Sequence, residues 1–104
     1  MPEPAFPAVA ADPGVIRQVL SERPELMLVS FSFETGSEGR PHSHPHVQGT
    51  YVREGRFLFT VDGETKEIGR GDSLVVPANA VHGCRCLEAG VLIDSFAPRR
   101  DDFL

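Results

Sequence analysis

Three of the four histidines in this sequence lie within five residues, at His42, His44 and His46. In an extended segment, side chains two residues apart point to the same side, so His42 and His44 present two imidazoles to one face. Gln48 follows four residues later on the same side. Imidazole nitrogens and an amide oxygen are suitable ligands for a divalent first-row metal. Short histidine patterns also arise by chance in exposed polar turns, so the rest of the sequence has to decide between the two interpretations.

A second patterned segment runs from Gly71 to the fourth histidine, His82. It reads as a turn, a short apolar strand, a turn that contains Pro77, and then a strand that His82 enters. Together the two segments resemble the two signature motifs of the cupin superfamily, and the resemblance covers roughly residues 26–98. The residues that match the motifs are Gly39, His42, His44, Gly55, Gly71, Pro77 and His82. His46 lies outside the motif positions, and the sequence is as compatible with a His46 side chain that supports the ligands or faces the substrate as with one that is simply exposed.

The sequence departs from the cupin motifs at a few positions. The gap between Gly39 and His42 is shorter than usual, and Gln48 occupies the position of a glutamate. Asn79 replaces a motif glycine, which the backbone tolerates because asparagine also adopts left-handed angles, and Cys86 replaces a final asparagine. The resemblance implies an all-β fold, a small double-stranded β-helix (jelly-roll) barrel. It also implies a divalent transition metal held by His42, His44, Gln48 and His82.

These ligand types accommodate nickel, zinc, manganese, iron or copper, so they leave the identity of the metal open. An amide is a weaker ligand than a carboxylate, and Gln48 is therefore either a ligand or a residue just outside the coordination sphere. As a ligand it would leave the full charge of the divalent ion in place.

The last part of the chain adds a second group of chemically useful side chains. Strand alternation places Leu92, Asp94 and Phe96 on one face. If this segment forms a hairpin with the strand that begins at His82, Asp94 lies near the metal and is a candidate general acid or base. Asp94 could equally well be a structural residue whose carboxylate is hydrogen-bonded at the end of a strand.

Residues 91–104, together with residues 42–48 and 59–64, resemble the small cupins of pectin degradation. Those proteins ketonise the 4,5-unsaturated monouronates released from pectin or alginate, opening the ring to a linear keto sugar acid. The resemblance implies a small anionic sugar-acid substrate and a catalytic group of Asp94, Phe96 and Arg100. In this group Asp94 moves the proton, the phenyl ring faces the sugar, and the guanidinium binds the carboxylate. Two alternatives stay open: a metal-dependent cupin oxygenase, and a non-catalytic cupin module that binds a metal or a sugar acid.

Short apolar runs separated by turn residues predict an all-β fold with hardly any helix. Strands are expected at residues 26–34, 50–54, 56–62, 64–68, 73–76, 81–88 and 91–97. The inward-facing rows are Met27, Val29, Phe31 and Phe33 in the first of these strands and Phe57, Phe59 and Val61 in the third. The pair Asp62-Gly63 predicts a tight hairpin after the third strand.

The N-terminal part of the chain is less regular. We expect a proline-rich arm at residues 1–14, ahead of a single cupin domain at residues 15–104. Residues 15–20 form either a strand or one helical turn, which periodicity cannot separate in so short a run. Residues 21–25 are expected to form a turn, because Pro24 biases the residue before it away from helix.

The formal net charge of −5 argues against a nucleic-acid-binding surface, which needs a basic face. No apolar run approaches the roughly 18 residues of a membrane-spanning helix, and the N-terminus has no secretory signal pattern. The expectation is a cytoplasmic protein without membrane association, in which Cys84 and Cys86 are reduced thiols. Barrels of this type leave sheet edges that a partner often covers, and we therefore expect a homodimer.

Overall fold

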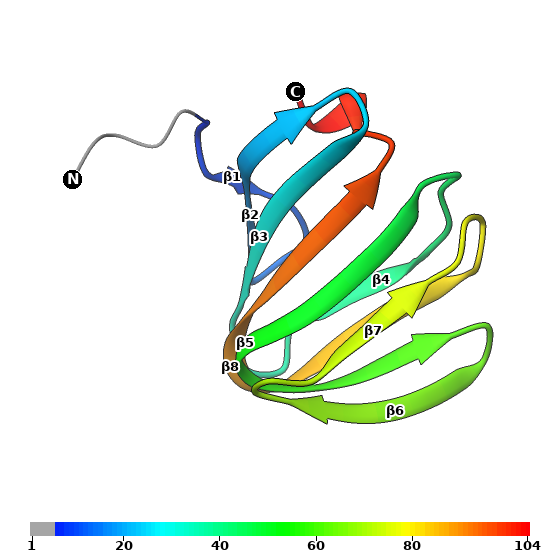
Figure 1. Cartoon of the computed structure of the whole chain (residues 1–104). Helices are drawn as coiled ribbons and strands as arrows, with labels where there is room; N and C mark the ends of the chain where they lie inside the picture. Colours follow the sequence, from blue (N-terminus) through cyan, green and yellow to red (C-terminus); the bar gives the residue numbers. More distant parts are fainter. Residues whose placement is uncertain (1–5) are drawn as a thin grey trace.

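The computed structural model describes residues 6–104, and Pro2 and Pro4 of the predicted arm lie outside the described residues. The described elements, in chain order, are β1 (Val9–Ala10), β2 (Val15–Arg23), β3 (Leu26–Phe33), β4 (Glu38–His42), β5 (Val47–Val61), β6 (Glu64–Gly69), β7 (Ser73–Val76), β8 (His82–Ala97) and the 3₁₀ helix η1 (Asp101–Phe103). All strand pairs among them are antiparallel (Figure 1). The predicted all-β class is confirmed. None of the described helices is long and apolar enough to cross a membrane.

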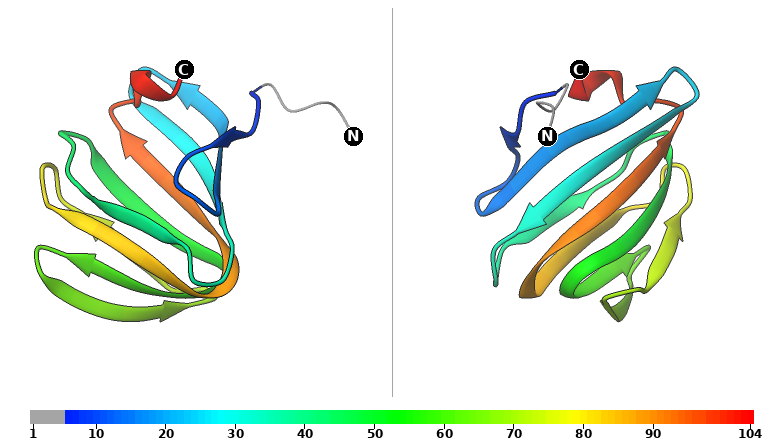
Figure 2. Two further views of the ribbon diagram at one scale, coloured as in Figure 1. Left: turned by 180° about the vertical axis from the view of Figure 1, so that it is seen from behind. Right: turned by 60° about the vertical axis from the view of Figure 1, so that its left-hand side comes forward.

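The two longest strands, β5 and β8, lie side by side from the pair Val47 and Ala97 to the pair Val61 and His82. Each of them changes its other partner along its length: β5 pairs first with β7 and then with β6, and β8 pairs first with β4 and then with β3. Both strands bend at one corner of the molecule, and the sheet folds into two layers that open away from this corner (Figures 1 and 2). This arrangement is the expected jelly-roll barrel.

Two glycines lie against the facing strand at the bend. Gly55 has a φ of 84°, and a Cβ atom there would overlap the carbonyl oxygen of Glu88. A Cβ atom on Gly90 would overlap the carbonyl oxygen of Glu54. The sequence prediction that β5 and β8 are each interrupted at these glycines is wrong. Without side chains, the two backbones approach closely enough for continuous strands to bend, and the register shifts on both sides of Glu54.

Close backbone contact at the bend predicts that Gly90→Ala lowers the free energy of unfolding by about 2–4 kcal/mol, because something in the backbone must shift to admit the methyl group. The matched control is Gly49→Ala in β5, where an added Cβ would meet Cβ of Ser95 at an ordinary 3.9 Å. Urea denaturation should give the control a midpoint close to that of the parent chain. Equal midpoints for the two variants would contradict this account of the bend.

The N-terminal half of the sheet differs from the sequence prediction at several places, because β1 and β4 were not among the expected strands and one predicted turn is shorter. Residues 15–20 belong to strand β2, which continues to Arg23, so the predicted turn at residues 21–25 shrinks to Pro24 and Glu25. Proline excludes helix at the preceding residue but allows extended backbone, which is what a strand requires. The predicted hairpin is confirmed, because Asp62 and Gly63 both have positive φ, at 48° and 81°.

The predicted inward rows supply the core. Met27, Val29 and Phe57 are completely buried, whereas Phe31 and Val61 are only partly buried. The core divides into two clusters, and the smaller cluster consists of Val19, Met27, Val29 and Phe96, covered by Phe6, Phe31 and Phe103. This smaller cluster forms the floor on which the end of β8 and helix η1 rest, and it supports the residues described next.

Candidate metal centre

The three histidines of the candidate metal centre come from different elements. His42 ends β4 and is the register partner of His82, the first residue of β8, while His44 lies in the loop between β4 and β5. The ring centroids of His42 and His44 lie 4.4 and 4.8 Å from that of His82, and one nitrogen from each of the three rings lies within 4.8 Å of the others. Gln48, in β5, contacts His44. The fold therefore gathers the four side chains predicted as ligands.

Each of these three imidazoles is oriented by a backbone carbonyl group. The contacts are Nδ1 of His42 to Arg40 O at 2.9 Å, Nδ1 of His44 to His46 O at 3.0 Å, and Nδ1 of His82 to Ala80 O at 2.9 Å. A carbonyl oxygen can only accept a hydrogen bond, so each Nδ1 carries the proton and each Nε2 keeps its lone pair. Hydrogen bonds of this kind orient metal-binding histidines in proteins.

Contacts at the Nε2 atoms fit a cation. His82 Nε2 is buried and has no hydrogen-bond partner in the part of the chain that the structure describes. His44 Nε2 lies 3.0 Å from Oε1 of Gln48, so two lone pairs face each other. The amide is held in this orientation because its Nε2 donates to Thr50 Oγ1 at 3.0 Å and points to Asp94 Oδ2 at 3.4 Å. A divalent cation that accepts both lone pairs would remove the conflict.

Burial keeps two of the three imidazoles neutral. It lowers the pKa of His82 to about 4, and it also lowers the pKa of His44, where the oxygen atoms of Gln48 and His46, which would accept from a protonated ring, oppose the effect. The neutral ring is the form that binds metal ions. Protonation at neutral pH therefore does not relieve the contact between His44 and Gln48, and a metal would not have to displace a proton from either ring.

Hydrogen bonds connect Asp94 to the candidate ligands. Thr50 Oγ1 accepts from Gln48 and donates to Asp94 Oδ1 at 2.8 Å. The carboxyl group is only 6% exposed, and burial raises the pKa of Asp94 to about 7, while Thr50 and Arg100 oppose the increase. A carboxyl group with this pKa can both take up and release a proton near neutral pH.

The route by which Asp94 reaches the centre differs from the expectation. The prediction of a hairpin between the strands of His82 and Asp94 is wrong, because both residues belong to the single strand β8. Asp94 is instead the register partner of Thr50 in β5. Asp94 and His82 lie on the two sides of the bend at Gly90. The polar contacts that link Asp94 to His44 therefore run through Thr50 and Gln48 of the neighbouring strand β5.

A cavity of about 540 Å³ opens beside these groups and is lined by His42, Gln48, His82, Asp94, Phe96 and Arg100, among others. Phe96 is 2% exposed, and its ring lies 5.1 Å from Cζ of Arg100. Arg100 donates from Nε and Nη2 to the two carboxylate oxygens of Asp102 at 3.0 and 2.9 Å. The three residues predicted as the catalytic group thus share one cavity with three of the predicted ligands.

Thr50 was missed in the sequence analysis, although it lies two residues after Gln48 and strand alternation alone would place both on one face. Other residues near the candidate centre contribute less to it. His46 contributes its carbonyl group to His44, but its side chain does not line the cavity. Tyr51 points to the outside and is 49% exposed. Cys84 does line the cavity, and burial raises the pKa of its thiol to about 12, so it is uncharged.

A short antiparallel jelly roll with converging imidazoles, which could hold a metal ion, at the ends of its strands is the architecture of a cupin. Residues 29–95 match the cupin domain family Cupin_2, and the chain belongs to the cupin superfamily.

Within this superfamily the chain is similar to the pectin degradation protein KdgF of Dickeya dadantii, with 40% identity over 93 residues, which cover 88% of this chain and 84% of that protein. The solved structure of KdgF from a Halomonas species matches with a TM-score of 0.90 and 38% identity, over 94% of this chain and 91% of that one. An RmlC-like cupin from Shewanella frigidimarina matches with a TM-score of 0.91 and 42% identity, over 96% and 90% of the two chains. The predicted resemblance to the pectin-degradation cupins is therefore confirmed.

Proposed function

We propose that this cupin is a metal-dependent enzyme that opens and ketonises 4,5-unsaturated uronates from pectin or alginate. The observation that carries the proposal is the hydrogen-bonded series from Gln48 through Thr50 to the buried Asp94. It joins a group that can move a proton to the candidate metal ligands inside one cavity. The similarity to a protein named for pectin degradation supports the choice of substrate class.

The proposed reaction is an isomerisation, so protons are conserved. The hydroxyl proton at C1 of the sugar leaves, the bond between C1 and the ring oxygen breaks, and C1 becomes an aldehyde. The electron pair passes to the ring oxygen as an enolate at C5, and a proton added at C4 completes the ketone. Asp94 is the residue that we assign to this transfer, because burial raises its pKa to about 7 and Thr50 holds its Oδ1 in place.

His42, His44, Gln48 and His82 are the residues that would hold the metal. When bound, a divalent metal supplies Lewis acidity and attraction for the oxygen atoms of the sugar. Because all four ligands are neutral, none of them reduces the charge of the ion, in contrast to a site with a glutamate at the position of Gln48. Nickel, zinc, manganese, iron and copper all suit three imidazoles and an amide.

The remaining two residues of the proposed catalytic group bind and orient the substrate. Phe96 is 2% exposed, so it would give the sugar only the apolar part of its ring that reaches the cavity wall. Its ring also supports Arg100, whose Cζ lies 5.1 Å from the ring centroid. Arg100 uses two N–H groups for Asp102, which fixes its guanidinium, and three N–H groups remain for the sugar carboxylate. Asp102 in turn has its pKa lowered by this pairing, so the carboxylate that positions Arg100 stays ionised.

The deciding experiment follows the ultraviolet absorbance of the enol of 4,5-unsaturated galacturonate. The metal-loaded chain is expected to accelerate the loss of this absorbance over the spontaneous reaction, and a chelator should remove the acceleration. A rate equal to the spontaneous one with each of the five metals would refute the proposal. The product should be the linear keto acid, which NMR distinguishes from an oxidised product.

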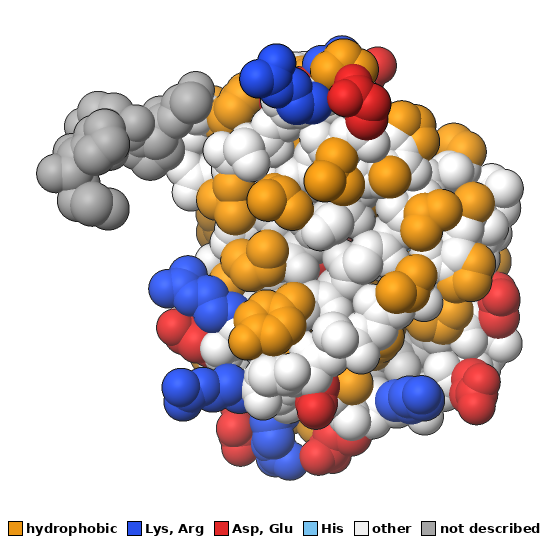
Figure 3. All heavy atoms as spheres, in the orientation of Figure 1, with side chains coloured by type: hydrophobic (Ala, Val, Ile, Leu, Met, Phe, Trp, Pro, Cys, Tyr) orange, Lys and Arg blue, Asp and Glu red, His pale blue; other side chains and the backbone are white. Residues whose placement is uncertain are grey.

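We also propose that the chain forms a homodimer. The outer face of the sheet carries the row Gln18, Ser30, Ile93, Tyr51 and Ser73, in register across five strands. Apolar and uncharged side chains cover the middle of this face, and charged ones lie at its margins (Figure 3). Each copy carries a net charge of −5, so the electrostatic repulsion between two copies is smallest when they meet through this uncharged face. The molar mass in solution tests this proposal.

A further inference from the structure

Arg17 is a charged residue in an otherwise apolar inward row. Its neighbours in this row of β2, Val15 and Val19, are 2% and 5% exposed, and its register partner in β3 is Phe31. A guanidinium in such a row is costly unless it faces a polar space. Arg17 lines the same cavity as Asp94 and Arg100, so its charge faces the space where a substrate of the candidate site would lie.

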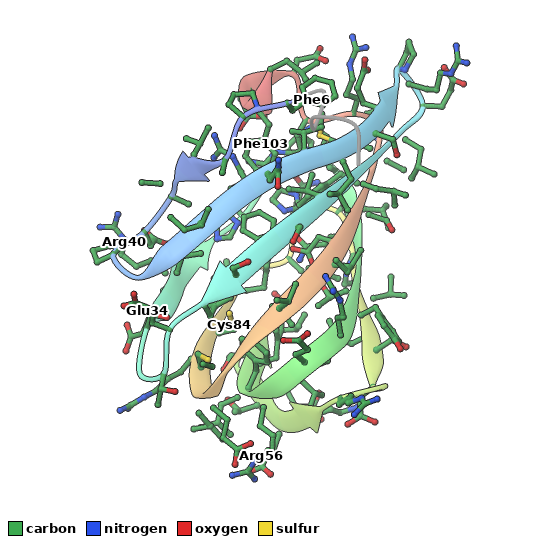
Figure 4. All side chains as sticks on the ribbon, turned by 90° about the vertical axis from the view of Figure 1, so that its left-hand side faces the viewer. Phe6, Glu34, Arg40, Arg56, Cys84 and Phe103 are labelled. Carbon is green, nitrogen blue, oxygen red and sulfur yellow. The ribbon has the colours of Figure 1, made fainter. Side chains whose placement is uncertain are left out.

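An aromatic ring from the other end of the chain lies against this arginine. Cζ of Arg17 is 4.1 Å from the ring centroid of Phe103, and Cζ of Arg100 is 4.2 Å from the same centroid. The ring itself is held edge-on by Phe31 at 6.2 Å and by Phe96 at 5.7 Å. Figure 4, which looks onto β2, shows Phe103 at the end of the molecule where Phe6 and η1 lie. Contact with a ring face orients a guanidinium without using its N–H groups.

Arg17 differs from the other arginines of the cavity in its charge balance. Arg40 pairs with Asp12 at 2.9 Å, and Arg100 pairs with Asp102. Within residues 6–104, neither an ion pair nor a side-chain hydrogen bond engages the guanidinium of Arg17. The cavity therefore contains one arginine whose charge is not balanced by a described carboxylate and whose five donors are available.

We infer that Arg17 binds the carboxylate of the sugar acid, together with Arg100, and so selects anionic over neutral sugars. The inference rests on the proposed function for its substrate class, and it adds a binding residue from β2 that the cupin motifs do not include. Phe103 is the positioning residue, since its ring lies within reach of both guanidinium groups. A carboxylate in the cavity that both arginines line would receive charge-assisted hydrogen bonds from each of them.

The test measures binding and not turnover. Calorimetry on the zinc-loaded chain compares galacturonate, which has no double bond to react, with its uncharged methyl ester. The parent chain should bind galacturonate more tightly than the ester. Arg17→Gln should weaken galacturonate binding by about 10- to 100-fold and leave ester binding unchanged. Arg17→Lys should bind galacturonate with an affinity between those of the parent chain and Arg17→Gln, because an ammonium group keeps the charge but lacks the forked donors of a guanidinium.

The matched control is Arg53→Gln, which removes the same charge from an exposed position of β5 outside the cavity. It should bind both ligands as the parent chain does. The inference is overturned if Arg17→Gln binds galacturonate like the parent chain, if it loses both ligands equally, or if the parent chain does not distinguish the acid from the ester. Binding that depends on Arg17 without any ketonisation would instead refute the proposed reaction and leave the carboxylate site standing. Ketonisation with an unchanged KM in Arg17→Gln would support the proposed reaction and refute the carboxylate site at Arg17.

Discussion

Replacing His82 with alanine is expected to lower the affinity for divalent metal by about 100-fold or more. His82 Nε2 is buried without a hydrogen-bond partner in the described chain, and its Nδ1 is held by Ala80. The ring thus offers one lone pair in a fixed direction. Because burial lowers the pKa of His82 to about 4, the ring is neutral at pH 7 and no proton competes with the metal. Calorimetric titration with nickel, zinc and manganese measures the change.

His46→Ala is the control for this prediction, since it removes an imidazole from the same stretch of sequence. The carbonyl group of His46 contacts His44 Nδ1, and alanine retains that group, while the His46 ring that is lost lies edge-on to His44 at 5.4 Å and outside the cavity. The control should therefore keep its metal affinity within a few-fold. Metal binding should also raise the melting temperature of the control and of the parent chain, but not that of His82→Ala. Equal affinity of the two variants would show that the metal binds elsewhere.

Asp94→Asn is expected to reduce kcat for ketonisation by about 10²- to 10⁴-fold, the usual effect of removing a general acid or base. The amide has the shape of the carboxyl group, and it can still accept the hydrogen bond from Thr50. It cannot take up a proton and pass it on. The three histidines and the cavity arginines are untouched, and only the 3.4 Å contact from Gln48 Nε2 to Oδ2 is lost, so metal affinity and galacturonate binding should change by no more than a few-fold. Rates are followed by enol absorbance and binding by calorimetry.

Cys84→Ser provides the comparison for this variant, because Cys84 lines the same cavity and the replacement has nearly the same shape. Burial raises the pKa of its thiol to about 12, so no thiolate takes part at neutral pH, and kcat should stay within a few-fold of the parent value. If Asp94→Asn kept full activity, the proton would have to move through another group. A joint loss of activity and metal affinity would assign Asp94 a structural role instead.

The sequence was most informative where the chemistry is local. Strand alternation put His42 and His44 on one side, and the resemblance of two short motifs to those of the cupins added His82 to them. The pair Asp62-Gly63 adopts left-handed angles that few other residues accept, which made its hairpin predictable as well. The inward rows of β3 and β5 followed from the same alternation, because one face of each strand is buried.

The tertiary structure decided how distant segments meet. Gly55 and Gly90 looked like strand ends, since glycine punctuates strands and turns alike. Only the contact of each glycine with the backbone of the facing strand shows that β5 and β8 continue and bend. That bend places Asp94 beside Thr50, a neighbour that its own segment of sequence does not reveal.

The composition of the chain and its motifs determined the all-β class and the histidine cluster, because these depend on residue type and short-range periodicity. The orientation of the Gln48 amide and the placing of Arg17 against Phe103 depend on the tertiary structure alone. The hydrogen bonds that hold that amide come from β5 and β8, and the ring that holds that arginine comes from the opposite end of the chain. No local pattern encodes contacts of this kind, since they arise only when the completed barrel brings β5 beside β8 and β2 beside the last residues of the chain.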